Sequence, residues 1–289
     1  MIQCIVLALA LLQGVKPELV SLLGKPFYAQ PDKQGAIQKA DAALAADPKN
    51  LDLLLAAARA RDTVLEFRAA IELYGKAIIL APGDPRPYRF RGHRYISIRR
   101  FDEAVRDLEK AATLAPSSFD VLYHLGLAHY LRGDFAKAAV EYGRCLEWKE
   151  APGALPAGWR SCTSVGGNDD SRVALADWRY RALRRAGRHD EARGLLETIH
   201  EKLAVQENPS YYQALLLYKR LRREPELLDP ARLTGNQLPT VGYAVANFHL
   251  VEGRREEACT LLRRVVEDPN WNAFGFIAAE VELARKTCP

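Results

Sequence analysis

Arginine is the residue type whose number and placement suggest chemistry most clearly in this sequence. The arginines gather in three stretches, at 86–100, 179–188 and 220–223. A guanidinium group presents several N–H donors in one plane and therefore matches carboxylate and phosphate groups. If the fold brings these stretches to one face, they predict a surface that recognises an anion. The alternative is that the arginines are simply solvated.

Residues that could carry catalysis are scattered and lack partners in the sequence. The chain contains no phosphate-binding, dinucleotide-binding, zinc-protease or serine-hydrolase motif. Cys162 lies near Arg160, which could lower the pKa of its thiol, but no matched base is identifiable. His124 and His129 are five positions apart and would point to different sides of a helix. We therefore predict that the protein is not an enzyme and needs no cofactor.

The cysteines are spaced unlike metal ligands. Neither a CxxC motif nor a cluster of cysteine and histidine is present among Cys4, Cys145, Cys162, Cys259 and Cys288, so no zinc site is predicted. Two pairs are close enough in sequence to form disulfides, namely Cys145 with Cys162 and Cys259 with Cys288. They would pair if the protein is exported to an oxidising compartment, and would otherwise be free, partly buried thiols.

The N-terminus carries an apolar run from Ile5 to Leu12. The run is shorter than the roughly 20 residues of a membrane span, so no transmembrane segment is predicted. Its length suits the core of a signal peptide, although no Lys or Arg precedes it and no good cleavage site follows. We expect residues 1–14 to be a signal and the protein to be periplasmic or extracellular. If the run is instead a frayed helix or a misassigned start, the protein is cytoplasmic.

The composition is that of a folded protein with a mild basic excess. Hydrophobic residues make up 48% and charged residues 27% of the chain, which argues against wholesale disorder. The net charge is +5, whereas a nucleic-acid-binding protein usually shows a strongly basic face or tract. Nucleic acid is therefore not the expected partner.

The positioning of all these residues depends on an internal repeat with a step of 34 residues. Small residues and prolines recur in this step at Gly92 and Gly126, at Ala70, Ala104 and Ala138, at Ala77, Ala111 and Cys145, and at Pro82 and Pro116. Three consecutive units follow, at 51–84, 85–118 and 119–152. Each is expected to be a pair of helices that approach closely at the small residues and end at the proline. Each pair exposes an apolar face that only the next pair can cover.

The step and these residue types resemble the tetratricopeptide (TPR) repeat. The second unit matches the family pattern with Tyr88, Gly92, Tyr95, Ala104, Ala111 and Pro116. The resemblance covers about 50–272, because turns like the one at 133–138 recur at 187–192 and 253–258. It implies an all-α, right-handed superhelix of about five helix pairs with a C-terminal capping helix. It also implies a scaffold that holds a protein or peptide in a concave groove.

The sequence and this resemblance together predict a domain organisation of six parts. These are a signal at 1–14, an extension with a lead-in helix at 15–50, three TPR units at 51–152, an inserted loop at 153–172, degenerate TPR-like units at 173–272, and the capping helix at 273–289.

The resemblance also indicates which residues line the concave groove, because fixed positions of each first helix face it. The predicted binding residues are Arg59, Arg86, Arg89, His93, Tyr123, Tyr130, Arg181, Arg184, Tyr243 and Asn247. Such a groove would be basic and tyrosine-bearing, and would suit a protein or peptide with an acidic segment. Some TPR domains clamp a terminal carboxylate with Lys and Asn at two of these positions. Here the first unit has Leu55 and Arg59 there, so binding of chaperone tails is not predicted.

Two other functions stay open at this point. The inserted loop could carry an enzyme site, and it or the arginine-rich face could serve a regulatory module that binds nucleic acid. An enzyme would show a closed pocket at the loop, whereas a scaffold would show an open groove.

Overall fold

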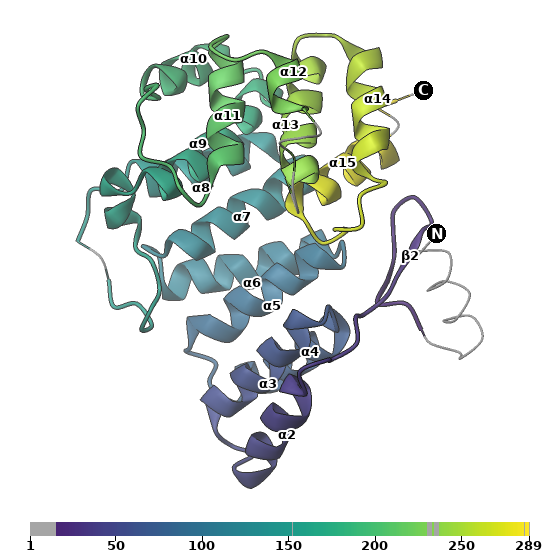
Figure 1. Ribbon diagram of the computed structural model, residues 1–289. Helices are drawn as coiled ribbons and strands as arrows, with labels where there is room; N and C mark the ends of the chain where they lie inside the picture. The colour runs from purple at the N-terminus through teal and green to yellow at the C-terminus, as the bar shows by residue number, and fades with distance from the viewer. Residues whose placement is uncertain (1–15, 152, 230–232, 234–236, 286, 289) are drawn as a thin grey trace. The chain divides into compact units, whose positions relative to one another are not determined.

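The computed structural model describes residues 16–151, 153–229, 233, 237–285 and 287–288, so the predicted signal at 1–14 lies outside the described residues. Over the described part, the chain consists of helices joined by turns, with one hairpin of two-residue strands near the N-terminus. The predicted all-α architecture of helix pairs is confirmed (Figure 1).

The chain divides into two compact units, Met1–Pro82 and Gly83–Pro289. The boundary falls inside the predicted block of three TPR units, between its first and second members. The two units are therefore described separately below.

In the described part of the first unit, the hairpin is followed by three helices. Strands β1 (Leu19–Val20) and β2 (Pro26–Phe27) are antiparallel, and they precede α2 (Ala36–Ala46), α3 (Leu51–Thr63) and α4 (Phe67–Leu80). Helix α3 packs against both α2 and α4. The repeat positions Ala70 and Ala77 are 0% exposed, as expected for a close contact between helices.

The second unit contains the remaining helices. They are α5 (Pro85–Ser97), α6 (Phe101–Leu114), α7 (Phe119–Arg132), α8 (Phe135–Leu146), the 3-10 helix η1 (Cys162–Gly167), α9 (Asp169–Arg185), α10 (His189–Glu197), α11 (Pro209–Tyr218), α12 (Glu224–Leu227), α13 (Gln237–Val251), α14 (Arg255–Val265) and α15 (Phe274–Ala284). Consecutive helices pack as pairs from α5/α6 to α13/α14, with the short α12 in place of a full partner for α11.

The helix ends follow from local sequence. Asp84 caps α5, where Pro85 occupies the first position, and Ser118 caps α7 through a hydrogen bond from the backbone N–H of Val121. Helix α7 ends at Gly133, whose φ of 95° lies in the left-handed region that glycine adopts without steric cost. These signals fix the repeat boundaries near the places that the 34-residue step predicts.

Glycine at the predicted contact between paired helices is required by space. A Cβ atom added to Gly126 would lie 2.7 Å from the ring of Tyr142, and one added to Gly92 would lie 2.7 Å from Leu108 Cγ. Both distances are well inside van der Waals contact. The recurring glycine therefore lets helices α5 and α7 approach their partners α6 and α8.

Two disulfides lie in the second unit, between Cys145 and Cys162 and between Cys259 and Cys288. The Cα atoms are 4.9 and 5.6 Å apart, distances usual for a disulfide. These are the two pairings that the sequence left open. The first ties the insertion to the end of α8, and the second ties the segment after α15 to α14.

Helix α15 occupies a different place from the one expected of a terminal cap. It packs on α13 and α14, as a cap would, but it also contacts α7 (Figure 1). Every residue from Gly275 to Glu282 is buried. A helix that is buried all round belongs to a core, whereas a cap would present one polar face to solvent.

The close contact at Gly126 leads to a stability prediction. Replacing Gly126 with Leu should lower the free energy of unfolding by about 1–3 kcal/mol, because the new side chain must displace the Tyr142 ring. Urea denaturation of the purified protein measures the change. The control is Gly194→Ala in α10, where no atom lies within 4 Å of the added methyl and stability should hold or rise. Equal stability of the two variants would contradict the packing described.

Candidate functional site

The predicted groove residues of α5 keep part of their surface accessible. Arg86 binds Asp84 with its Nε and Nη2 atoms at 3.0 and 2.8 Å, and 28% of its side chain is exposed. Arg89 lies 3.4 Å from Asp120 of α7, with 16% of its side chain exposed. His93 is half-buried. In the first unit, Arg59 on α3 is exposed.

The predicted groove tyrosines lie in the interior of the second unit. Tyr130 of α7 and Tyr243 of α13 share a hydrogen bond of 2.8 Å between their hydroxyl groups, and both side chains are at most 1% exposed. The Tyr130 hydroxyl also donates to Oδ1 of Asn247, which is fully buried. Tyr123 reaches across to Tyr211 of α11 at 3.2 Å. These side chains contact one another across the space that an open groove would leave to a partner.

Arg181 of α9 is also fully enclosed. It forms an ion pair with Asp177, and its Nε lies 3.2 Å from the Tyr218 hydroxyl. Its guanidinium carbon lies 4.5 Å from the centre of the Trp178 ring and 5.4 Å from that of Tyr243. Burial raises the pKa of Asp177 to about 6, although Arg181 opposes the shift, so the carboxylate is largely ionised at neutral pH.

Arg184, one turn further along α9, is half-buried and engaged in the same unit. It donates to the Tyr180 hydroxyl at 2.8 Å, to Glu252 at 2.9 Å and to the carbonyl oxygen of Val251 at 3.1 Å. Its charge is thus matched by a carboxylate at the start of the turn after α13.

Helix α15 supplies acidic and aromatic groups to the faces of the earlier helices. Glu280 pairs with Arg99, at the turn between α5 and α6, with 3.0 Å between its Oε2 and the arginine Nε. Glu282 pairs with Arg185 of α9 at 2.8 Å. The Phe274 ring, at the start of α15, lies 5.3 Å from His93 and 6.2 Å from Tyr123.

The open tyrosine-bearing groove expected from the sequence is therefore not what the structure shows. Tyr123, Tyr130, Arg181, Tyr243 and Asn247 do occupy the inner face, but they are buried because α7, α9, α13 and α15 of the same chain pack together there. The physical reason is that tyrosines and an apolar helix gain more from burial than from facing water. Arg59, Arg86 and Arg89 keep accessible surface, and their role in binding stays a prediction.

Two histidines lie at the rim of this interior. The rings of His93 and His124 are 4.4 Å apart, and Nδ1 of His124 lies 2.5 Å from the carbonyl oxygen of Asp120. Burial, reinforced by Arg89, lowers the pKa of His124 to about 3, and burial also lowers that of His93. Both imidazoles are consequently neutral at physiological pH.

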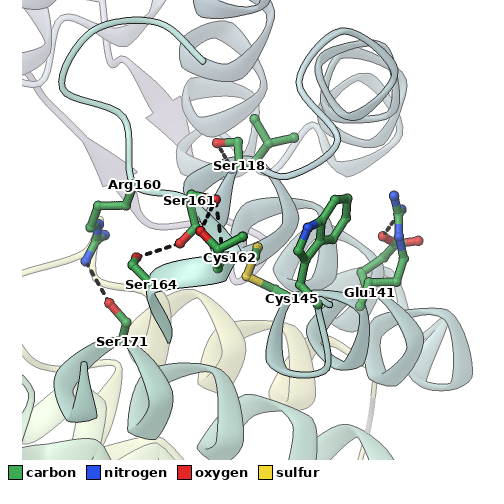
Figure 2. Close-up of a disulfide and its surroundings, with 12 residues drawn as sticks. Ser118, Glu141, Cys145, Arg160, Ser161, Cys162, Ser164 and Ser171 are labelled. Carbon is green, nitrogen blue, oxygen red and sulfur yellow. Dashed lines mark hydrogen bonds and ion pairs between the residues drawn. A yellow bond between two sulfur atoms is a disulfide. The ribbon is translucent and has the colours of Figure 1, made fainter. Parts of the chain in front are cut away.

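The insertion brings a cation that sequence reasoning did not assign to the binding face. Arg160 lies 3.2 Å from Asp120, the carboxylate that Arg89 also contacts. Figure 2 shows Arg160 beside the Cys145–Cys162 disulfide, with its guanidinium directed at Ser171. Burial raises the pKa of Asp120, but Arg89, His124 and Arg160 outweigh it and the pKa is lowered. The only sequence signal for this position was the arginine two residues before Cys162.

Other chemistry finds little support among the residues described. No set of three or more His, Cys, Asp or Glu side chains in this part of the chain is placed to hold a metal ion. Nor is any described helix long and apolar enough to cross a bilayer.

These features define the class of the protein. Helix pairs that repeat every 34 residues, with small residues at the contact, make it a helical repeat protein. The model of the tetratricopeptide repeat family matches residues 90–154. The chain is a tetratricopeptide repeat protein.

Curated relatives match over part of this chain. The small glutamine-rich tetratricopeptide repeat-containing protein 2 of Saccharomyces cerevisiae is 32% identical over 82 residues, which are 28% of this chain and 24% of the relative. The Hsp70-Hsp90 organizing protein of Triticum aestivum is 35% identical over 92 residues, 32% of this chain and 16% of that protein. The match thus spans a quarter or less of each relative's length.

Solved structures are similar as well. MamA is 20% identical, and the match covers 69% of this chain and 88% of the MamA chain with a TM-score of 0.46. YrrB, described as a TPR protein with an unusual peptide-binding site, is 17% identical. The match covers 84% of this chain and 97% of YrrB, and its TM-score is also 0.46.

The enclosed ion pair gives a test of whether the inner face is closed. Arg181→Met should lower the free energy of unfolding by about 3–5 kcal/mol, because it leaves the buried carboxylate of Asp177 without its counter-charge. Adding Asp177→Asn should recover part of the loss, since the unpaired charge is then gone. Urea denaturation of the two single variants and the double variant completes the cycle. An Arg181→Met variant as stable as the wild type would instead mean that the arginine faces solvent.

Proposed function

We propose that the protein is a scaffold that binds another protein, and that the partner contacts the face of α5 that carries Arg86 and Arg89. The observation that supports this choice is the difference in burial along the inner face. Tyr123, Tyr130, Arg181, Tyr243 and Asn247 are covered by the chain itself, whereas Arg86 and Arg89 of α5 keep 28% and 16% of their side chains accessible. A partner can reach Arg86 and Arg89 without unfolding the helices that bury the other side chains.

The matched relatives support a binding role in general terms. One of them is by its name an organizing protein of Hsp70 and Hsp90. The Lys and Asn of the carboxylate clamp are replaced here, for example by Arg89 and His93 in the second unit. We therefore propose a different partner, one with an acidic segment that complements arginine forks.

We also propose that the protein is not a catalyst. His93 and His124 lie beside the binding face, yet burial lowers the pKa of both, so neither is poised to exchange protons near neutral pH. Cys162, the candidate nucleophile of the insertion, is engaged in a disulfide. No specific observation favours nucleic acid as a partner.

Charge reversal on α5 tests the binding face. Arg86→Glu combined with Arg89→Glu should weaken capture of the native partner by about tenfold or more, because two favourable charge contacts become repulsive. The partner is first identified by pull-down from the native extract, and its affinity for both proteins is then measured by calorimetry.

The melting temperature of the double variant must be checked in parallel, because Arg89 contacts Asp120. As a control, Arg193→Glu with Arg106→Glu makes the same change of net charge at two side chains that are about 70% exposed on other helices. If the α5 variant binds the partner with full affinity, α5 does not belong to the binding face.

We further propose that the protein works outside the cytoplasm. The support is that both disulfides close within the second unit, and such bonds persist in oxidising compartments. Protein purified from the native host should then lack residues 1–14 or so and be found in the periplasmic or extracellular fraction. N-terminal sequencing decides the matter, and cytosolic protein that keeps its first residues would contradict the proposal.

A further inference from the structure

The insertion ends in a segment that is fastened to the start of α7. The carbonyl oxygen of Arg160 accepts the N–H of Phe119 at 3.0 Å, and the N–H of Cys162 donates to the carbonyl oxygen of Ser117 at 2.8 Å. The disulfide to Cys145 holds the same segment to the last turn of α8 (Figure 2). Residues 160–162 are thus fixed from two sides, although they close a long loop.

This attachment determines where the side chain of Arg160 lies. Its guanidinium carbon stands 4.2 Å from the centre of the Phe119 ring, an arrangement in which the cation is attracted to the ring face. Nη2 lies 3.2 Å from Asp120 and Nη1 lies 3.4 Å from Ser171 Oγ. With 45% of the side chain exposed, this is the most accessible cation around Asp120.

Asp120 is shared by two arginines. Arg160 approaches it from the insertion at 3.2 Å and Arg89 approaches it from α5 at 3.4 Å. Both contacts are long for a charge-assisted hydrogen bond. The two guanidinium groups thus lie beside the same carboxylate, where a carboxylate of a partner could contact both.

Aromatic rings flank this cluster. Phe90 of α5 and Trp159 of the insertion lie edge to face with 6.4 Å between ring centres, and the Arg89 guanidinium carbon is 5.0 Å from the Phe90 ring. Both rings are half-buried. The surface therefore combines cations with apolar area, as a protein segment with acidic and apolar side chains requires.

We propose that Arg160 and Arg89 together bind a carboxylate of an acidic partner segment, and that the Cys145–Cys162 disulfide positions Arg160 for this contact. This inference rests on the proposed function, because it names the chemistry of the partner at the same face. A peptide fits better than a nucleic acid, since Arg160 and Arg89 converge on one point, whereas a phosphate backbone calls for cations spread along a row.

The test uses the full chain and a fluorescein-labelled oligoglutamate peptide that contains one tryptophan, with binding followed by fluorescence anisotropy at low ionic strength. Arg160→Glu should weaken binding by about tenfold, the equivalent of one charge-assisted hydrogen bond. Arg160→Lys should keep part of the affinity, because the charge persists without the fork. The matched control Arg193→Glu on α10 carries the same charge change and should bind like the wild type.

The positioning role of the disulfide has its own variant. Cys145→Ser with Cys162→Ser leaves every charge in place, and it should weaken binding about as much as Arg160→Ala does. Unchanged helix content by circular dichroism shows that the fold persists. If this variant binds like the wild type, the disulfide does not position Arg160.

The outcomes separate this inference from the proposed function. Loss of binding in Arg86→Glu/Arg89→Glu but not in Arg160→Glu would overturn the inference and leave the α5 face intact. No loss in either variant, or no binding by the wild type, would overturn both. Tighter binding of a single-stranded oligonucleotide of matched charge, lost with Arg160→Glu, would show a phosphate site and contradict the acidic-peptide proposal.

Discussion

Arg99 and Glu280 are 181 positions apart in the chain, yet their side chains form an ion pair that is 2% and 1% exposed. Burying two charges is costly unless the remaining donors are satisfied. Here the arginine also donates to the carbonyl oxygens of Ser97 and Trp271 at 2.5 and 2.9 Å. The backbone adds a conformational cost, because Arg99 has a φ of 62°, in the left-handed region. The corresponding position of the following repeat is occupied by Gly133. The interaction is retained at a strained position and joins the turn after α5 to α15.

The closure of the second unit explains the places of most other side chains on its inner face. Once α15 is held against α7, side chains from α7, α9, α11 and α13 meet one another and exclude solvent. Gly275 belongs to the same arrangement, because a Cβ atom there would lie 2.0 Å from the carbonyl oxygen of Pro239 in α13. Tyrosine hydroxyls and the Asp177–Arg181 pair then supply hydrogen bonds that buried polar groups need. Arg86 and Arg89 on α5 and Arg160 of the insertion, which the disulfide fastens beside α5, keep accessible surface.

The sequence predicted the individual helix pairs, but it did not predict that the inner face of the second unit is buried by the chain itself. Some features depend only on neighbours within one repeat, namely the 34-residue step, the contact at Gly126 and the helix ends. Such local requirements recur at the same positions of each repeat and can therefore be recognised in the sequence. The burial of Arg181 and Tyr243 depends on how tightly successive pairs curve, and no single residue encodes that. The same residue types suit an inner face whether a partner or the chain itself covers it.

One signal was available: α15 reads Phe-Gly-Phe-Ile-Ala-Ala-Glu-Val-Glu-Leu-Ala, and so continuous an apolar helix belongs in a core. Arg160 could not be placed, because its position depends on a disulfide partner 17 residues away.

Native-state hydrogen exchange of α15 tests the closed inner face most directly. If α15 is part of the core, the amides from Gly275 to Glu282 should exchange only through global unfolding, with the same free energy that urea denaturation gives for the second unit. The backbone of α13, which α15 contacts, should be protected to the same degree. Exchange of α15 at a much lower free energy, with α13 still protected, would contradict this account. It would mean that α15 leaves the inner face readily and that the tyrosine-bearing groove is open to a partner after all.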